Sequence, residues 1–173
     1  MPRYFMSFIL LLATSAAGCS APAATDLPTT SSAPSASGAA PATPVHDGRS
    51  IEITGNDTMK FSVTEIAAQP GEKLSVTLVN AGTTPKFSMG HNWVLLAATV
   101  DIQPFLVAAA EAVTTDYVPA AQKPQIIAST KLLGPKESDT VTFTAPTTPG
   151  RYEFLCTFPG HYQVGMRGVL IVG

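Results

Sequence analysis

Short runs of alternating apolar and polar residues fill the chain from about residue 50 onward. In 74–78 every second residue is apolar, and the same period of two runs through 140–144. Because successive side chains of a strand point to opposite faces, each run predicts a strand with one buried and one solvated face. Further candidate strands are 51–54, 60–64, 92–96, 126–132, 152–156 and 168–172. Seven or eight short antiparallel strands predict an all-β domain over residues 48–173, a Greek-key β-sandwich or barrel.

One segment of this region departs from the strand pattern. Residues 104–114 are rich in alanine and begin with Pro104, a residue that is common at the first position of helices. This composition predicts one helical insertion of about three turns between strands. Glu111 in this segment and Asp116 just beyond it are expected to face solvent, and the segment offers no catalytic group.

Residues 1–18 are typical of an export signal. A short basic start precedes a largely apolar run, which is too short for a membrane span of about 20 residues. The following Ala16-Ala17-Gly18-Cys19 resembles the lipobox of bacterial lipoproteins, although Ala16 stands where that pattern favours leucine. Cleavage after Ala17 would instead give an ordinary secreted protein. We expect residues 1–18 to be a signal peptide and Cys19 to carry a lipid anchor on the periplasmic side of the cell membrane.

A spacer is expected between this anchor and the β domain. Residues 20–47 consist mostly of Ala, Pro, Ser and Thr, a composition that cannot bury an apolar core and predicts a disordered linker. The net charge is −2 and only 13% of residues are charged, which argues against nucleic-acid binding. Since Cys19 belongs to the export region, Cys156 is expected to be free of any disulfide.

Side chains that bind soft metals gather in two stretches of the β domain. Cys156, His161 and Met166 follow one another at equal intervals of five positions, and His91 lies in a separate stretch far upstream. Alternation along 152–156 places the thiol on the apolar face at the end of a strand. The loop that follows returns the imidazole and the thioether to the same pocket.

This donor set favours copper over other metals. A trigonal plane of one thiolate and two imidazoles with a weak thioether ligand is typical of blue-copper electron-transfer sites. Asn92 and Thr157 each follow a candidate ligand, and we expect their side chains to hydrogen-bond to each other. Phe158 and Pro159 are expected to exclude water from the pocket, which influences the redox potential.

Each candidate ligand has an ordinary structural explanation when taken alone. Buried Cys, Met or His residues are commonly core components. The chain has only three histidines, however, and two lie in these stretches while His46 lies in the spacer. A copper enzyme would need further histidines, and a cysteine hydrolase would need a helix N-terminus or a positioned base. We therefore expect a protein that is not an enzyme. The alternative function is a periplasmic copper carrier or storage protein.

The two ligand stretches carry a family resemblance. Residues 89–95 (MGHNWVL) and 156–161 (CTFPGH) resemble the copper segments of azurins, so the domain is similar to the cupredoxins. Four residues separate His161 from Met166, where azurins have three. This longer loop, the helical insertion and the N-terminal anchor are similar to the auracyanins, blue copper proteins of filamentous anoxygenic phototrophs.

The resemblance implies a ligand set and a cofactor. It implies one copper ion with His91, Cys156 and His161 as equatorial ligands and Met166 as the axial ligand. In azurins the carbonyl matching Gly90 approaches the metal from the opposite side, and the longer loop leaves that contact open here.

The resemblance also implies partners. It implies that single electrons pass from a quinol-oxidising membrane complex to a reaction-centre or other c-type cytochrome by transient docking. We expect the protein to be a monomer.

Because His161 lies on a loop, we expect its ring edge near the surface. The surrounding apolar side chains would be Phe158, Pro159, Tyr162 and Val164.

Overall fold

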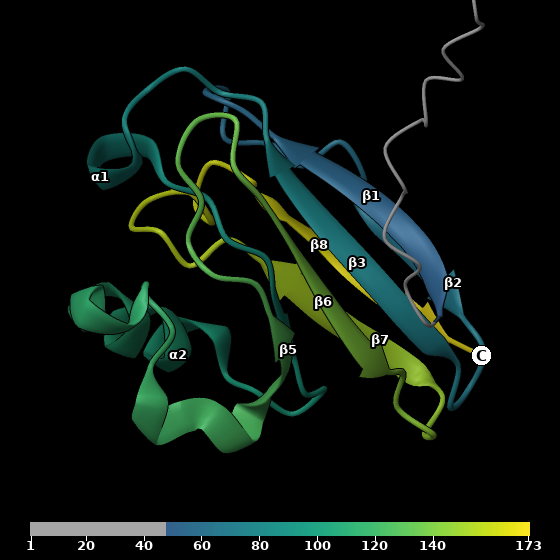
Figure 1. Cartoon of the computed structure of the whole chain (residues 1–173). Helices are drawn as coiled ribbons and strands as arrows, with labels where there is room; N and C mark the ends of the chain where they lie inside the picture. Colours follow the sequence, from purple (N-terminus) through teal and green to yellow (C-terminus); the bar gives the residue numbers. More distant parts are fainter. Residues whose placement is uncertain (1–47) are drawn as a thin grey trace, which may run out of the picture. The chain divides into compact units, whose positions relative to one another are not determined.

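The computed structural model describes residues 48–173 (Figure 1). The expected signal peptide, Cys19 and spacer therefore lie outside the described residues. Within 48–173, no helix is long and apolar enough to cross a membrane. The described region contains eight strands: β1 (Arg49–Gly55), β2 (Glu65–Ala68), β3 (Lys73–Asn80), β4 (Val94–Leu96), β5 (Ile126–Ser129), β6 (Ser138–Thr144), β7 (Gly150–Leu155) and β8 (Arg167–Val172).

The strands form two sheets, which confirms the predicted all-β sandwich. One sheet has the order β1-β3-β6 and the other the order β2-β8-β7-β4-β5. The expectation that all strands are antiparallel is wrong, because β1 pairs with β3 and β2 with β8 in parallel. The chain passes from one sheet to the other between β1 and β2. These two strands therefore do not pair with each other, and β1 pairs with β3 while β2 pairs with β8. Alternation reports burial and not strand direction, so it could not reveal these two pairs.

The core fills the space between the sheets. Trp93 is fully buried, and its ring lies 5.5 Å from that of Phe154 and 5.9 Å from that of Phe143. Phe61 also packs against Phe154, with 5.9 Å between ring centroids. The predicted strand 60–64 is wrong, since Phe61 makes only an isolated bridge to Gly55 and β2 begins later. This stretch is held by the packing of Phe61 and by single hydrogen bonds, such as that from Ser62 N to the Thr54 carbonyl at 2.9 Å, and not by a continuous ladder.

The helical insertion is present, and the excursion that contains it is longer than expected. Helix α2 (Ile102–Glu111) is capped by Asp101, whose side chain accepts a hydrogen bond from Gln103 N at 3.3 Å. Pro104 is thus the third helical residue rather than the first. It still removes no helical hydrogen bond, because the N–H groups of the first four residues of a helix have no intrahelical partner. Phe105 and Ala109, four positions apart, are the buried residues of the helix. Two 3-10 turns, η1 (Val113–Thr115) and η2 (Ala120–Gln125), complete the excursion before β5.

A second short helix was not predicted. Helix α1 (Lys86–Met89) lies just before His91, and its Phe87 is 84% exposed. In Figure 1, α1, the loop that joins β7 to β8 and the excursion around α2 lie on the same side of the strands. This side contains the residues that the sequence singled out.

Candidate metal centre

Three of the four predicted donors meet in one buried pocket. His91 Nδ1 lies 3.2 Å from His161 Nδ1, and Cys156 Sγ lies 3.5 Å from the same His161 atom. One nitrogen or sulfur atom from each residue falls within a group no more than 4.8 Å across. The exposed fractions of His91, Cys156 and His161 are 0%, 0% and 2%.

His91 is fixed from outside its own segment. Its backbone N–H donates to the Leu133 carbonyl at 3.1 Å, and the Leu133 N–H donates back to the His91 carbonyl at 2.8 Å. Two residues on, Trp93 N donates to Thr130 Oγ1 at 3.0 Å, and Thr130 N donates to the Trp93 carbonyl at 3.0 Å. The backbone that carries the imidazole is therefore held by residues 130–133, the segment that follows β5.

Gly90 is needed here for space. A Cβ at this position would lie 2.7 Å from the Lys86 carbonyl and 2.9 Å from the Leu132 side chain. Its φ of −68° is one that any residue can adopt, so the constraint is the close approach of α1.

The loop between β7 and β8 carries the other donors and closes on itself. Cys156 N donates to the Met166 carbonyl at 3.0 Å, and Met166 N donates to the His161 carbonyl at 2.9 Å. His161 N in turn donates to the Phe158 carbonyl at 3.1 Å. Gly160 has a φ of +86°, a left-handed conformation that glycine adopts without strain. Short-range hydrogen bonds thus bring the loop's donors back to the end of β7.

Met166 lies on the same side of the pocket as His91. Its side chain is fully buried. A Cβ added to Gly55 would lie 2.7 Å from the Met166 methyl carbon and 3.4 Å from the His91 ring. The thioether is therefore next to the imidazole, at the end of β1.

The predicted hydrogen bond between Asn92 and Thr157 is present. Asn92 Nδ2 donates to Thr157 Oγ1 at 2.7 Å, and Thr157 N donates to Asn92 Oδ1 at 2.9 Å. Both residues are buried, at 0% and 2% exposure. This pair joins the two ligand segments directly beside His91 and Cys156.

The surface around His161 differs from the expectation. Its ring is stacked against Phe158, with 4.7 Å between centroids and 35° between planes. Because this half-buried phenyl ring covers the imidazole, the solvent-accessible edge is much smaller than the sequence suggested. Pro159 and Val164 are exposed beside it, and Tyr162 is partly exposed.

Two contacts of the site were not predicted. Asp116 is not simply solvated, because its carbonyl accepts a hydrogen bond from Asn92 Nδ2 at 3.0 Å. Lys60 Nζ donates to the Val164 carbonyl in the ligand loop. No local pattern could have revealed either contact, since the partners lie 24 and 104 residues apart.

Burial sets the protonation of the donors. It raises the pKa of the Cys156 thiol to about 12, and it lowers the pKa of His161 to about 4 with help from the neighbouring His91. Burial also lowers the pKa of His91. At neutral pH both imidazoles are therefore uncharged and keep a lone pair for a metal, while the thiol loses its proton when a cation binds. One soft anion and two neutral imidazoles fit a copper ion.

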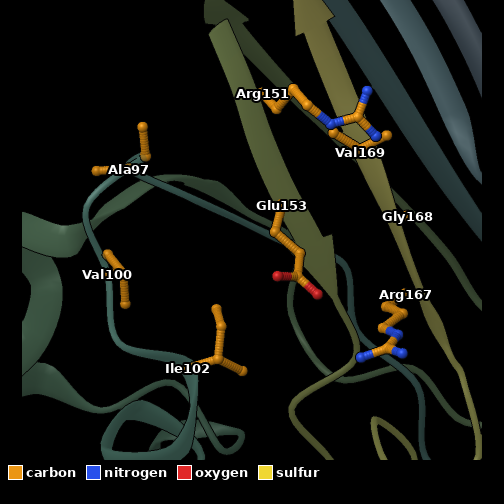
Figure 2. A pocket seen from close by; sticks show the side chains of 9 residues that line it. Ala97, Val100, Ile102, Arg151, Glu153, Arg167, Gly168 and Val169 are labelled. Carbon is orange, nitrogen blue, oxygen red and sulfur yellow. The ribbon is translucent and has the colours of Figure 1, made fainter.

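A separate groove on the outer sheet face has no part in this pocket. It measures about 330 Å³. Figure 2 shows the Glu153 carboxylate pointing into it from β7, with Val100 and Ile102 opposite and Arg151 and Arg167 alongside. None of the predicted donors lines this groove.

The comparison with known families agrees with this geometry. The family described as copper binding proteins, plastocyanin/azurin family, matches residues 49–173. The chain belongs to the plastocyanin/azurin family. This cupredoxin has one copper ion as its cofactor, and the donors of the buried pocket have the identities and spacing that a single type 1 site requires.

Similar proteins span almost the whole β domain. Azurin of Pseudomonas aeruginosa is 38% identical over 125 residues, which cover 70% of this chain and 82% of that azurin. Outer membrane protein H.8 of Neisseria gonorrhoeae is 37% identical over 111 residues, which cover 63% of this chain and 60% of that protein.

Two solved auracyanin structures have the same fold. The dithionite-reduced auracyanin of the photosynthetic bacterium Roseiflexus castenholzii has a TM-score of 0.61 and 36% identity, covering 74% of this chain and 99% of its own. Auracyanin B has a TM-score of 0.64 and 30% identity, covering 75% and 92%. The predicted likeness to azurins and auracyanins is confirmed. Azurin-family cupredoxins are electron carriers and not enzymes, and the homology together with the His–Cys–His pocket supports a blue copper electron-transfer protein.

Proposed function

We propose that this cupredoxin is a mononuclear type 1 copper protein that shuttles single electrons between membrane redox complexes. His91, Cys156 and His161 are the equatorial ligands, and Met166 is the axial ligand. The observation that carries the proposal is the convergence of one sulfur and two imidazole nitrogens within 4.8 Å in a buried pocket. Copper, when bound there, supplies a one-electron couple between Cu(II) and Cu(I).

The protein's own residues would keep the donors in place during this cycle. His91 is held by the Leu133 backbone, and the loop donors are held by the closed set of hydrogen bonds from Cys156 to Met166. The two forms of copper favour different geometries, so a pocket that moves little keeps the reorganisation energy of electron transfer low. The Phe158 ring excludes water from the His161 side.

Electrons would enter and leave near His161. Exposed apolar side chains occur on α1 and on the ligand loop, where Phe87 is 84% and Val164 is 45% exposed. An apolar surface of this kind suits brief docking, because transient redox encounters bury less than about 1,200 Å².

The cellular setting is a further part of the proposal. Donor and acceptor would be a quinol-oxidising complex and a reaction-centre or other c-type cytochrome, in a photosynthetic or respiratory chain. The likeness to an auracyanin from a photosynthetic bacterium supports this setting. Residues 1–18 would be a signal peptide, and residues 19–47 a linker anchored through lipid on Cys19, with a monomeric protein on the periplasmic side. The name of the related outer membrane protein H.8 supports a place in the cell envelope.

The visible spectrum of the copper-loaded protein tests the central claim. We expect an intense thiolate-to-copper charge-transfer band and a reversible one-electron wave, both lost in Cys156→Ser. A Cu(II) complex without this band would contradict electron transfer and favour a copper carrier or storage protein.

The route through His161 has its own test. In His161→Gly, we expect copper to bind in an altered centre with slowed electron exchange, because one equatorial donor is lost. Unchanged exchange kinetics would contradict this route. Mass spectrometry of the mature N-terminus tests the lipid on Cys19.

A further inference from the structure

We propose that Asp116 and Tyr117, at the end of the helical excursion, are positioning residues that hold the two ligand segments of the copper site in register. This inference rests on the proposed function for its metal, but its contacts belong to the protein alone. Asp116 binds Asn92 and residues beside His91 through hydrogen bonds and an ion pair. Tyr117 packs against the ring of Phe158.

The backbone at this pair is unusual. Asp116 has a φ of 57° and Tyr117 a φ of 59°, both in the left-handed region that non-glycine residues seldom adopt. Two consecutive residues of this kind persist only when their surroundings hold them. Tyr117 N donates to the Ala112 carbonyl at 2.9 Å, and Thr115 Oγ1 donates to the Val118 carbonyl at 2.8 Å. The turn aims the Asp116 carbonyl and the Tyr117 ring at the copper site.

The Asp116 carbonyl completes the hydrogen bonding of Asn92. Asn92 Nδ2 has two hydrogens, which serve Thr157 Oγ1 at 2.7 Å and the Asp116 carbonyl at 3.0 Å. Its Oδ1 accepts from Thr157 N at 2.9 Å. Because Asn92 is fully buried, loss of the Asp116 contact would leave an unpaired N–H, and only the two hydrogen bonds to Thr157 would hold the amide. Thr157, whose backbone follows Cys156 directly, would then be held less firmly.

The Asp116 carboxylate acts on the segment around His91. Its Oδ2 accepts from Leu132 N at 3.4 Å, next to the Leu133 that pairs with His91. Its Oδ1 lies 3.8 Å from Lys86 Nζ, at the start of α1. The carboxylate thus contacts both stretches of chain that flank His91.

Tyr117 supports His161 through one intermediate ring. Its ring meets Phe158 edge to face, with 5.0 Å between centroids and 62° between planes. Phe158 in turn stacks on His161 at 4.7 Å. Aromatic contact alone carries this support, so the phenol oxygen should be dispensable.

Metal-free protein provides the first test, by NMR exchange of the Asn92 side-chain amide. Asp116→Ala keeps the backbone carbonyl but disfavours the left-handed conformation that directs it at Asn92. We therefore expect exchange to become faster, by up to about tenfold if that hydrogen bond of average strength is lost. Asp116→Asn, which tolerates the left-handed conformation, should fold if the alanine variant does not, and should show a smaller acceleration. Val113→Ala, a change at a 59% exposed residue of the same excursion, is the control. Protection equal to wild type in both Asp116 variants would overturn the inference for Asp116.

Copper-loaded protein provides the second test. In Tyr117→Ala we expect a changed copper hyperfine splitting and electron self-exchange slowed by roughly two- to tenfold, given the strength of an aromatic pair. Tyr117→Phe should restore both values. Identical spectra and rates in Tyr117→Ala and wild type, or failure of Tyr117→Phe to restore them, would overturn the inference for Tyr117. If the wild-type protein shows no blue band, the proposed function fails, and the metal-free measurement still decides the role of Asp116.

Discussion

The two ligand-bearing segments are built in different ways. The segment that carries His91 is held by other parts of the domain, through backbone pairing with Leu133 and through Trp93 in the core. The loop from Cys156 to Met166 carries three of the four predicted donors and is held largely by hydrogen bonds within itself. Asn92 and Thr157 join the two.

This difference separates stability from metal chemistry. Changes in the first segment should disturb the fold, because its residues also belong to the sandwich. Changes in the loop should alter the copper centre and leave the sandwich intact. The predictions below test this division, from the largest expected effect to the smallest.

Trp93→Ala should destabilise the domain by about 3–5 kcal/mol, the usual cost of removing a large buried aromatic side chain. Trp93 is fully buried against Phe143 and Phe154, so the cavity cannot fill with solvent. Chemical denaturation of the metal-free protein measures this change. Phe158→Ala, in the loop, should cost clearly less because Phe158 is only partly buried. Equal losses from the two variants would contradict the division.

Acid should destabilise the metal-free protein through the loop histidine. The pKa of His161 falls from 6.5 to about 4 on folding, so between these values the unfolded chain binds the proton first. The free energy of unfolding should therefore drop as the pH falls through this window, by roughly 3 kcal/mol from this residue. His91, whose pKa is also lowered, adds to the drop.

Denaturation curves at several pH values measure this effect. His161→Gln cannot take up the proton, so its stability should change less between pH 6.5 and 4 than that of the wild type. The comparison between the two proteins cancels the titration of surface carboxylates. A parallel pH dependence in both would show that burial does not shift this imidazole.

Gly90 lies in the segment that carries His91 and Gly160 lies in the loop, so alanine substitutions at these two glycines compare the two segments directly. Gly90→Ala places a Cβ against the Lys86 carbonyl and should cost about 1–3 kcal/mol, as overpacking does. Gly160→Ala meets no atom within 4 Å, and only its φ of +86° opposes the substitution, at about 1 kcal/mol. Thermal unfolding of the two variants gives the order. The reverse order would mean that the loop is the more constrained segment.

Lys60→Met should have the smallest effect on stability, below about 1 kcal/mol, because the lysine is exposed. Its ammonium group donates to the Val164 carbonyl, so its loss should loosen the ligand loop and remove a positive charge beside that loop. The reduction potential should fall, since that charge disfavours Cu(II). Lys136→Met, at another exposed lysine, is the control. Equal potentials in the two variants would contradict a role for Lys60.

The sequence predicted the parts of the site that depend on local pattern. Alternation along β7 placed Cys156 on the buried face, and the even spacing to His161 and Met166 indicated one loop. Alternation could not reveal that β2 lies beside β8, because burial carries no information on strand partners. Contacts such as that between Asn92 and Asp116 depend on how the excursion folds back, which propensity does not determine.

Strand β1 runs from the end of the domain that is far from the metal donors to the end that holds them. Its last residue, Gly55, touches the pocket through Met166, while its first residue, Arg49, lies about 20 Å away at roughly 3.3 Å per residue. The polypeptide therefore enters the sandwich at the end remote from the donors. The anchor proposed above would therefore join the domain at the end opposite to the donors, and the copper-bearing end would carry no tether to hinder its partners.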